Sequence, residues 1–175
     1  SSKISVITNI LGFVDNLIIG GGMAYTFIKN NGGRIGDSIF EADRLNDCTE
    51  ILSKAKNENV NVFLPEDILC SNEFSNSGLQ KLTNIYEVPE GWQGLDIGPN
   101  TMDKFEQVIL GSSTILWNGP MGVFEIPSFE KGTLVVAKTV AKATQNGAYS
   151  LIGGGDSVAA IKKFGLQNQV SFIST

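Results

Sequence analysis

The chain has 175 residues, of which 42% are hydrophobic and 18% are charged, and its formal net charge is −5. A chain of this size can bury roughly 70% of its unfolded surface, so the composition predicts one compact domain and excludes extensive disorder. With 13 Lys and Arg residues against 18 Asp and Glu, and with no basic cluster, the sequence argues against an extended nucleic-acid surface.

The scarcity of histidine and cysteine excludes several kinds of active site and metal site. The sequence has no histidine, which excludes a Ser-His-Asp site, a histidine zinc site and a histidine general base within it. Its two cysteines do not make a disulfide framework and favour a reducing, cytoplasmic setting. The longest apolar stretch, 17–25, is too short for a membrane helix. Residues 1–4 lack an initiator methionine and a signal-peptide profile, which indicates a cut within a longer chain.

Strand-like and helix-like segments alternate along the sequence. The expected strands are 16–19, 60–64, 114–117, 149–152 and 170–173. The expected helices are 2–11, which Ser2 can cap, and 45–56, 102–110, 133–143 and 156–163. Because the strands are continuous apolar runs, we expect both of their faces to be covered. The alternation predicts an α/β fold of three layers with a doubly wound, Rossmann-like parallel sheet, whose ligands bind at the carboxyl ends of the strands.

The stretch 71–92 interrupts this alternation. It is polar and irregular, and we interpret it as a small antiparallel addition. Glu66 and Asp67, which follow a strand end, are interpreted as structural or solvated residues. Lys162 and Lys163 are interpreted as a solvated helix end whose charge suits the helix dipole.

Two glycine runs each follow a strand and lead into a helix. They are Gly20-Gly21-Gly22 and Gly153-Gly154-Gly155. Such a run lets the backbone turn sharply and approach a ligand, and the next helix then presents free N–H groups and its positive dipole end. Two such corners favour an anion or nucleotide site, although either one alone is equally well explained as a tight turn. Neither run has the dinucleotide spacing, and the sequence contains no Walker A motif, so an ordinary P-loop enzyme is excluded.

Two further features fit a nucleotide site. Asp156 follows the second corner and can cap a helix, hold Mg²⁺ beside phosphate oxygens, or do both. Residues 117–125 follow a buried strand and combine glycine and proline with large apolar side chains. These apolar side chains can sandwich a flat base, and Glu125 can accept hydrogen bonds from ribose hydroxyls. A simple tight loop is the alternative.

Four segments together closely resemble the phosphoglycerate kinase family, in order and in spacing. They are 17–24 (LIIGGGMA), 91–99 (GWQGLDIGP), 117–125 (WNGPMGVFE) and 153–157 (GGGDS). The resemblance runs from Lys3 to Thr175 and covers the C-terminal, nucleotide-binding domain of that family. It implies that residues 1–175 form a single nucleotide-binding domain of a two-domain kinase, truncated at both ends. The family's Gly-Ala-Lys segment would precede Ser1, and a further glycine-rich loop would follow Thr175.

The resemblance also implies roles for the matching residues. Lys3 is the implied catalytic lysine, which reaches the transferring phosphoryl group. Gly21 and Gly22 of the first corner are implied to contact the adenine, and Gly154 and Gly155 of the second corner are implied to contact the phosphates. Glu125 is implied to bind the ribose, and Asp156 the metal. The implied nucleotide-binding residues are Gly21, Gly22, Gly94, Leu95, Asn118, Gly119, Pro120, Val123, Glu125, Gly154, Gly155, Asp156 and Ser157.

The activity implied by the resemblance is a glycolytic one. The parent enzyme is a phosphotransferase with a carboxyl acceptor, which moves a phosphoryl group reversibly between 1,3-bisphosphoglycerate and ADP with Mg²⁺. Such transfers depend on positioning and charge stabilisation, which accords with a chain that lacks histidine. 3-Phosphoglycerate would bind through the missing N-terminal domain, so the chain alone is not expected to be competent.

The expected partner of the chain itself is ATP or ADP, and we expect a cytoplasmic monomer that binds neither nucleic acid nor membrane. Two alternatives stay open on the residues alone. One is a nicotinamide dehydrogenase domain, which suits the architecture but lacks the glycine spacing. The other is a non-catalytic nucleotide-binding module.

Overall fold

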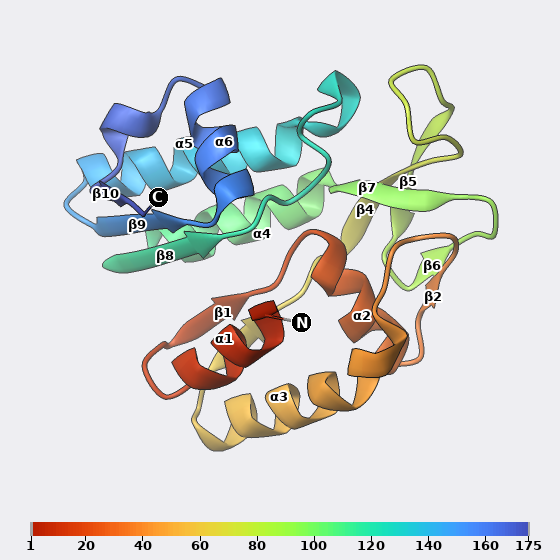
Figure 1. Ribbon diagram of the computed structural model, residues 1–175, viewed down its shortest axis with the longest axis horizontal. Coiled ribbons are helices and arrows are strands. Elements are labelled where there is room, and N and C mark those ends of the chain that lie inside the picture. The colour runs from red at the N-terminus through yellow and green to blue at the C-terminus, as the bar shows by residue number, and fades with distance from the viewer. Residues whose placement is uncertain (1, 175) are drawn as a thin grey trace.

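The computed structural model describes residues 2–174 (Figure 1). Its helices are α1 (Ser2–Ile10), α2 (Gly22–Asn30), α3 (Leu45–Asn57), α4 (Pro99–Leu110), α5 (Lys131–Gln145) and α6 (Gly155–Lys163). Its strands are β1 (Asn16–Ile18), β2 (Arg34–Ile35), β3 (Asn61–Phe63), β4 (Asp67–Ser71), β5 (Gln80–Asn84), β6 (Glu87–Val88), β7 (Gln93–Ile97), β8 (Thr114–Asn118), β9 (Tyr149–Gly153) and β10 (Phe172–Ile173). Short 3₁₀ turns occupy Ala42–Arg44, Pro127–Phe129 and Gln167–Gln169.

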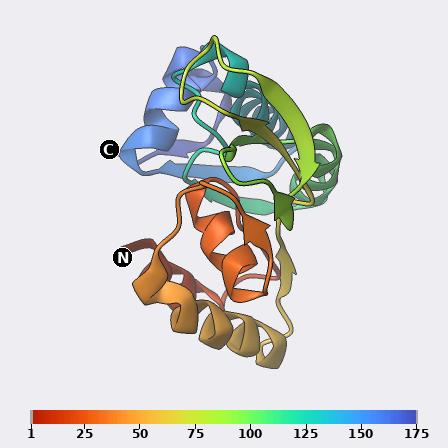
Figure 2. The same ribbon diagram turned by 90° about the vertical axis from the view of Figure 1, so that its right-hand side faces the viewer.

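The predicted α/β class is confirmed, with parallel strands and intervening helices. β1 pairs with β3, and β9 pairs with both β8 and β10, in every case in parallel. Within residues 2–174 these strands form two sheets, β1–β3 and β10–β9–β8, and not one hydrogen-bonded ladder. Figures 1 and 2 show the same division, with α1, α2 and α3 around the first sheet and α4, α5 and α6 beside the second. Every predicted helix and strand of the alternating pattern is present, with shifts of its ends only.

Each part of the molecule has a buried apolar interior. In the N-terminal part, Phe27 and Ile28 of α2 and Cys48 and Ile51 of α3 are buried where these helices pack together. Burial raises the pKa of the Cys48 thiol to about 11, so this residue packs as a small apolar side chain. No helix within residues 2–174 is both long enough and apolar enough to span a membrane.

The expectation that both faces of every strand are covered is wrong for the C-terminal sheet. Burial alternates along β8, where Ile115 and Trp117 are buried but Leu116 is 50% exposed. On the same face, Tyr149 and Phe172 are 52% and 55% exposed. α5 and α6 pack on β9 from the other side. In this chain, a continuous apolar run therefore does not show whether one or both faces of a strand are covered. The exposed face of these strands also carries apolar side chains, so the sequence lacks the usual alternation of polar and apolar residues.

The interpretation of residues 71–92 as an antiparallel addition is confirmed. β4 pairs antiparallel with both β5 and β7, in the order β5–β4–β7. This small sheet places β4 beside α4 and β7 beside α5, so that residues of these strands can cap the two helices.

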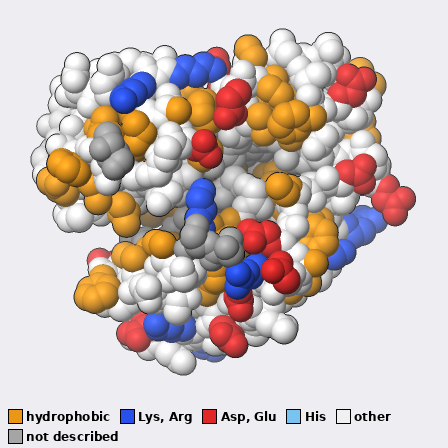
Figure 3. Space-filling view, viewed as in Figure 1, with side chains coloured by type: hydrophobic (Ala, Val, Ile, Leu, Met, Phe, Trp, Pro, Cys, Tyr) orange, Lys and Arg blue, Asp and Glu red, His pale blue; other side chains and the backbone are white. Residues whose placement is uncertain are grey.

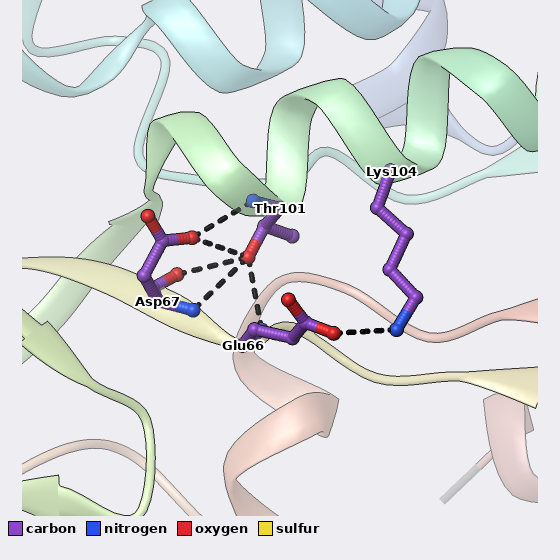
Figure 4. A network of polar contacts seen from close by, with 4 residues as sticks. All are labelled: Glu66, Asp67, Thr101 and Lys104. Atoms are coloured by element: carbon purple, nitrogen blue, oxygen red, sulfur yellow. Dashed lines mark hydrogen bonds and ion pairs between the residues drawn. The ribbon is translucent and has the colours of Figure 1, made fainter.

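The structural role expected for Glu66 and Asp67 is confirmed at the start of α4 (Figure 4). The Asp67 carboxylate accepts the backbone N–H groups of Asn100 at 3.0 Å and of Thr101 at 2.8 Å. The Thr101 hydroxyl in turn accepts the N–H groups of Glu66 and Asp67. Glu66 pairs with Lys104 at 2.6 Å. Asp67 is thus an N-terminal cap for α4 that is supplied from a distant strand.

Candidate functional site

The candidate site begins where β8 and β9 end together. Their register places Asn118 opposite Gly153. The next residue, Gly154, has φ 84° and is the N-cap of α6. A Cβ on Gly154 would lie 2.6 Å from the Asn118 side-chain oxygen, so both the backbone angle and the space demand glycine there.

Residues 118–125, which run from the last residue of β8 into the segment after it, are called here the β8 loop. The backbone N–H of Gly119 donates to the hydroxyl of Ser157, in the first turn of α6, at 2.6 Å. The indole N–H of Trp117 donates to the Gly119 carbonyl at 2.7 Å. Ser157 and Trp117 are both buried. These bonds join the β8 loop to the second glycine corner, so Ser157 holds the loop in this structure.

The first glycine corner meets the same loop from the opposite side. Gly21, with φ 64°, is the N-cap of α2, and a Cβ on it would lie 2.5 Å from the Pro120 carbonyl oxygen. A Cβ on Gly20 would overlap the Met121 side chain. The β8 loop therefore contacts both corners, although their strands belong to different sheets.

Lys3 is placed beside this loop by α1. A Cβ on Gly119 would lie 3.1 Å from the Lys3 ammonium nitrogen, and the Lys3 side chain is exposed. The structure thus brings a solvent-facing cation to the junction of the loop and the two corners. A cation there can attract an anionic ligand.

Gly94 and Leu95 adjoin the β8 loop through β7 and are buried. The Leu95 carbonyl accepts the N–H of Val123 at 2.8 Å, and the Gly94 N–H donates to the Ser38 hydroxyl at 2.9 Å. A Cβ on Gly94 would overlap the Tyr25 hydroxyl, whose pKa is raised chiefly by burial. Gly94 and Leu95 form the wall behind the loop.

Asp96, the next residue of β7, is a buried carboxylate that sequence reasoning missed. It is 1% exposed. Its two oxygens accept the N–H groups of Gly132 at 2.8 Å and Ile97 at 2.9 Å. Burial raises the pKa of Asp96 to about 7, against the opposing effects of these two N–H groups and of Lys131. Its only signal in the sequence is an acid between two apolar residues, Leu95 and Ile97.

Lys163 is exposed at the end of α6, as expected, but its side chain also has two protein partners. Its ammonium donates to the Phe124 carbonyl at 2.6 Å and pairs with Glu130 at 2.8 Å. The last turn of α6 lies against the β8 loop, which gives this lysine two partners that are 33 and 39 residues away in the numbering of the chain. The sequence around Lys163 gives no indication of partners so far away along the chain.

Glu125 and Asp156 are exposed, and neither carboxylate has a hydrogen-bond or ion-pair partner in the described part of the chain. The expectation that Asp156 caps α6 is wrong. The N-cap is Gly154, and no side chain caps this helix. Because Gly154 with its positive φ is the N-cap, α6 begins at Gly155 and Asp156 lies in the first helical turn. The helix dipole favours a negative charge at that position.

Seen from the side of Figure 1, the two parts of the molecule border a hollow along which charged side chains of both signs gather (Figure 3). Two grooves lie elsewhere, one between α1 and α3 and one where β3 meets α4. Neither is lined by any residue of the predicted site. Within residues 2–174, no group of three or more Cys, Asp or Glu side chains is arranged to hold a metal.

The fold and the site define a Rossmann-like α/β domain in which two glycine-rich corners and one loop meet at the carboxyl ends of parallel strands. The sequence model of the phosphoglycerate kinase family matches residues 1–175. The chain therefore belongs to the phosphoglycerate kinase family, as the resemblance of the four segments implies.

Individual relatives agree with this assignment. The chain is 50% identical over 175 residues to a phosphoglycerate kinase of Porphyromonas gingivalis and 48% identical over 176 residues to one of Thermosipho africanus. It covers 42% and 44% of these two proteins, so it spans less than half of their length.

Solved structures of phosphoglycerate kinases share the fold. That of Coxiella burnetii superposes with a TM-score of 0.95 at 42% identity, over 99% of this chain and 44% of the other. That of Pyrococcus horikoshii gives 0.79 at 27% identity, over 98% of this chain and 43% of the other.

The geometry of the second corner predicts opposite effects for two adjacent glycines. Gly154→Ala should lower the free energy of unfolding by about 1–3 kcal/mol, because an alanine would be strained at that φ and would press on Asn118. Gly155→Ala, at a helical position with open space around it, should raise it by up to about 1 kcal/mol. Urea unfolding followed by circular dichroism measures both changes. Equal effects of the two substitutions would contradict the turn described here.

Proposed function

We propose that this chain is a nucleotide-binding domain that holds ADP or ATP against the β8 loop, between the two glycine corners. The observation that carries this proposal is the contact of one loop with both corners, Pro120 against Gly21 and Gly119 against Ser157. A nucleotide is long enough to need separate sites for its base and its phosphates, and two corners that share a loop supply them. Backbone N–H groups can hold phosphate in a chain whose net charge is −5.

The first corner and the β8 loop are assigned to the nucleoside. Gly21 lies against Pro120 and Gly22 is exposed, so we assign both to the surface that meets a flat base, with Asn118, Gly119, Pro120 and Val123 along the loop. Gly94 and Leu95 are buried, so we assign them to the wall behind the loop. Glu125 is assigned to the ribose, because its exposed carboxylate has no partner within residues 2–174 and can accept two hydroxyl hydrogens.

The second corner is assigned to the phosphates. The first turn of α6 contains Gly155 and Asp156, whose backbone N–H groups have no acceptor within the helix. Mg²⁺ is commonly held by one or two carboxylates together with phosphate oxygens, and a single exposed, unpaired Asp156 beside a phosphate site fits that donor set. The ion would offset phosphate charge. Lys3, at the loop, would stabilise charge on the phosphoryl group that moves.

The reaction is proposed for the complete protein. Relatives named phosphoglycerate kinase are more than twice as long as this chain. We propose that the parent protein transfers a phosphoryl group between 1,3-bisphosphoglycerate and ADP, in the cytoplasm and as a monomer. Residues 1–175 would form its single nucleotide domain, and the part absent from this chain would bind 3-phosphoglycerate.

The chain alone should bind nucleotide but have negligible turnover, because the phosphoglycerate site is not part of it. A steady-state assay of ATP formation from 1,3-bisphosphoglycerate and ADP checks this expectation. Turnover near about 10 s⁻¹, a typical enzyme value, would contradict it.

Asp156→Asn should separate metal binding from phosphate binding. The substitution removes one negative charge but keeps the size of the side chain, so the mutant should lose most of the Mg²⁺-dependent part of its ADP affinity. Affinity for ADP without metal should stay the same or rise, because a repulsive charge is gone. Calorimetric titration of both proteins with and without Mg²⁺ gives the coupling free energy. If that coupling is the same in mutant and wild type, Asp156 does not bind the metal.

Glu125→Ala should weaken ADP binding by about 1.5–3 kcal/mol, the range for hydrogen bonds to charged groups. A deoxyribose analogue of ADP should lose less affinity on the mutant than on wild type, because the carboxylate that its missing hydroxyl would contact is already absent. Competition titrations of both ligands on both proteins give the four affinities that this comparison needs. Equal losses on the two proteins would place Glu125 away from the sugar.

A further inference from the structure

Asp96 lies where β7, the β8 loop and the start of α5 come together. It is 1% exposed, and a Cβ on Gly122 of the loop would lie 2.5 Å from one of its oxygens. A Cβ on Gly132 of α5 would overlap the same oxygen. The carboxylate therefore occupies a space left by two glycines, one on each neighbouring element.

Both oxygens of Asp96 accept backbone N–H groups, and one of these belongs to the first turn of α5. Gly132 is the second residue of α5 and donates at 2.8 Å across 36 residues of sequence. The local N-cap of this helix, Glu130, makes no side-chain capping bond, and its carboxylate pairs with Lys163 instead. Asp96 thus takes the place of a local cap and fixes where α5 begins.

The start of α5 in turn holds the β8 loop. The hydroxyl of Thr133 accepts the N–H groups of Met121 at 3.2 Å and Gly122 at 3.3 Å. The carbonyl of Leu95, beside Asp96 in β7, accepts the next loop N–H, that of Val123. Three consecutive loop amides are therefore bonded to the two elements that Asp96 joins. Met121 is buried and Gly122 and Val123 are half-buried, so the loss of these acceptors would leave poorly solvated amides unpaired, which is costly.

We propose that Asp96 is a positioning residue for nucleotide binding, which acts through Gly132 and Thr133 to hold the β8 loop at its place between the two glycine corners. This role rests on the proposed function of the loop. Met121 lies against Gly20 of the first corner and Gly119 is bonded to Ser157 of the second, so a shift of residues 121–123 would change both contacts. Asp96 itself is enclosed and need not touch the nucleotide.

Asp67 provides a matched control. It is also an aspartate in a strand of the small antiparallel sheet, and it caps α4 through two backbone N–H groups, as Asp96 caps α5 through one. The first turn of α4 holds the segment of Glu66 and Asp67 instead of the β8 loop (Figure 4). In either aspartate, substitution by asparagine places an NH₂ group against one of the N–H donors.

The test compares Asp96→Asn, Asp67→Asn and wild type in the 175-residue chain at pH 8, at a temperature at which circular dichroism shows all three folded. Both substitutions should lower the urea midpoint. Only Asp96→Asn should weaken ADP binding, by at least about tenfold, which corresponds to the lower end of the range for a hydrogen bond to a charged group. It alone should also speed hydrogen exchange at the amides of Met121, Gly122 and Val123 in the protein without nucleotide.

The outcomes separate this proposal from the proposed function. If wild type fails to bind ADP, the proposed function fails, and the exchange measurement still decides whether Asp96 positions the loop. Unchanged exchange in Asp96→Asn, or an equal loss of ADP affinity in Asp67→Asn, overturns the proposal. If Asp96→Asn does not fold, Thr133→Val, which removes the shared acceptor with little change in shape, must produce the faster exchange at Met121 and Gly122. Protected amides in that variant also overturn it.

Discussion

In the β8–β9 ladder Asn118 lies opposite Gly153, so the two strands end at the same level and the loop after one meets the helix after the other. The rest of the site depends on this register. A slip of β8 by one residue would turn Ile115 and Trp117 from the buried face to the exposed face, at the cost of two large apolar side chains. It would also separate the Gly119 N–H from the Ser157 hydroxyl, which joins the β8 loop to α6.

Burial divides the polar residues near the loop into two groups. Asp96, Thr133 and Ser157 are buried, and each accepts a backbone N–H of the loop or of a helix start. Lys3, Glu125 and Asp156 are exposed. In the described structure the two carboxylates of the second group have no protein partner, so they are free to bind a ligand at little cost in stability. The buried group holds the loop in place, and the exposed group contains the side chains that we propose bind the nucleotide and the metal.

Much of this arrangement could be predicted from sequence, because strand and helix periodicity and glycine turns are local properties. The strands that end near Gly20 and Gly153 and the helices that follow them are predicted by such local patterns, whereas the contact of both corners with the β8 loop is seen only in the structure. The order and spacing of the four segments then identify the family, which the comparison of the whole chain confirms.

What could not be predicted depends on partners distant in sequence. Asp96 caps a helix 36 residues away, and Lys163 bonds to a carbonyl 39 residues away, so neither role has a local signature. Asp156 suits an N-cap by residue type, but the positive φ of Gly154 gives that position to the glycine. The exposed face of the C-terminal sheet, which carries Leu116, Tyr149 and Phe172, could not be predicted because the strands have apolar residues on both faces.

The proposed function requires one nucleotide to occupy both glycine corners at once. Titration of the ¹⁵N-labelled chain with Mg²⁺ and ADP, followed by the backbone amide signals, shows whether it does. Amides of the first corner (Gly21 and Gly22), of the β8 loop and of the second corner (Gly155 and Asp156) should shift together and give a single dissociation constant. Shifts confined to one corner, or centred on the groove between α1 and α3, would contradict it.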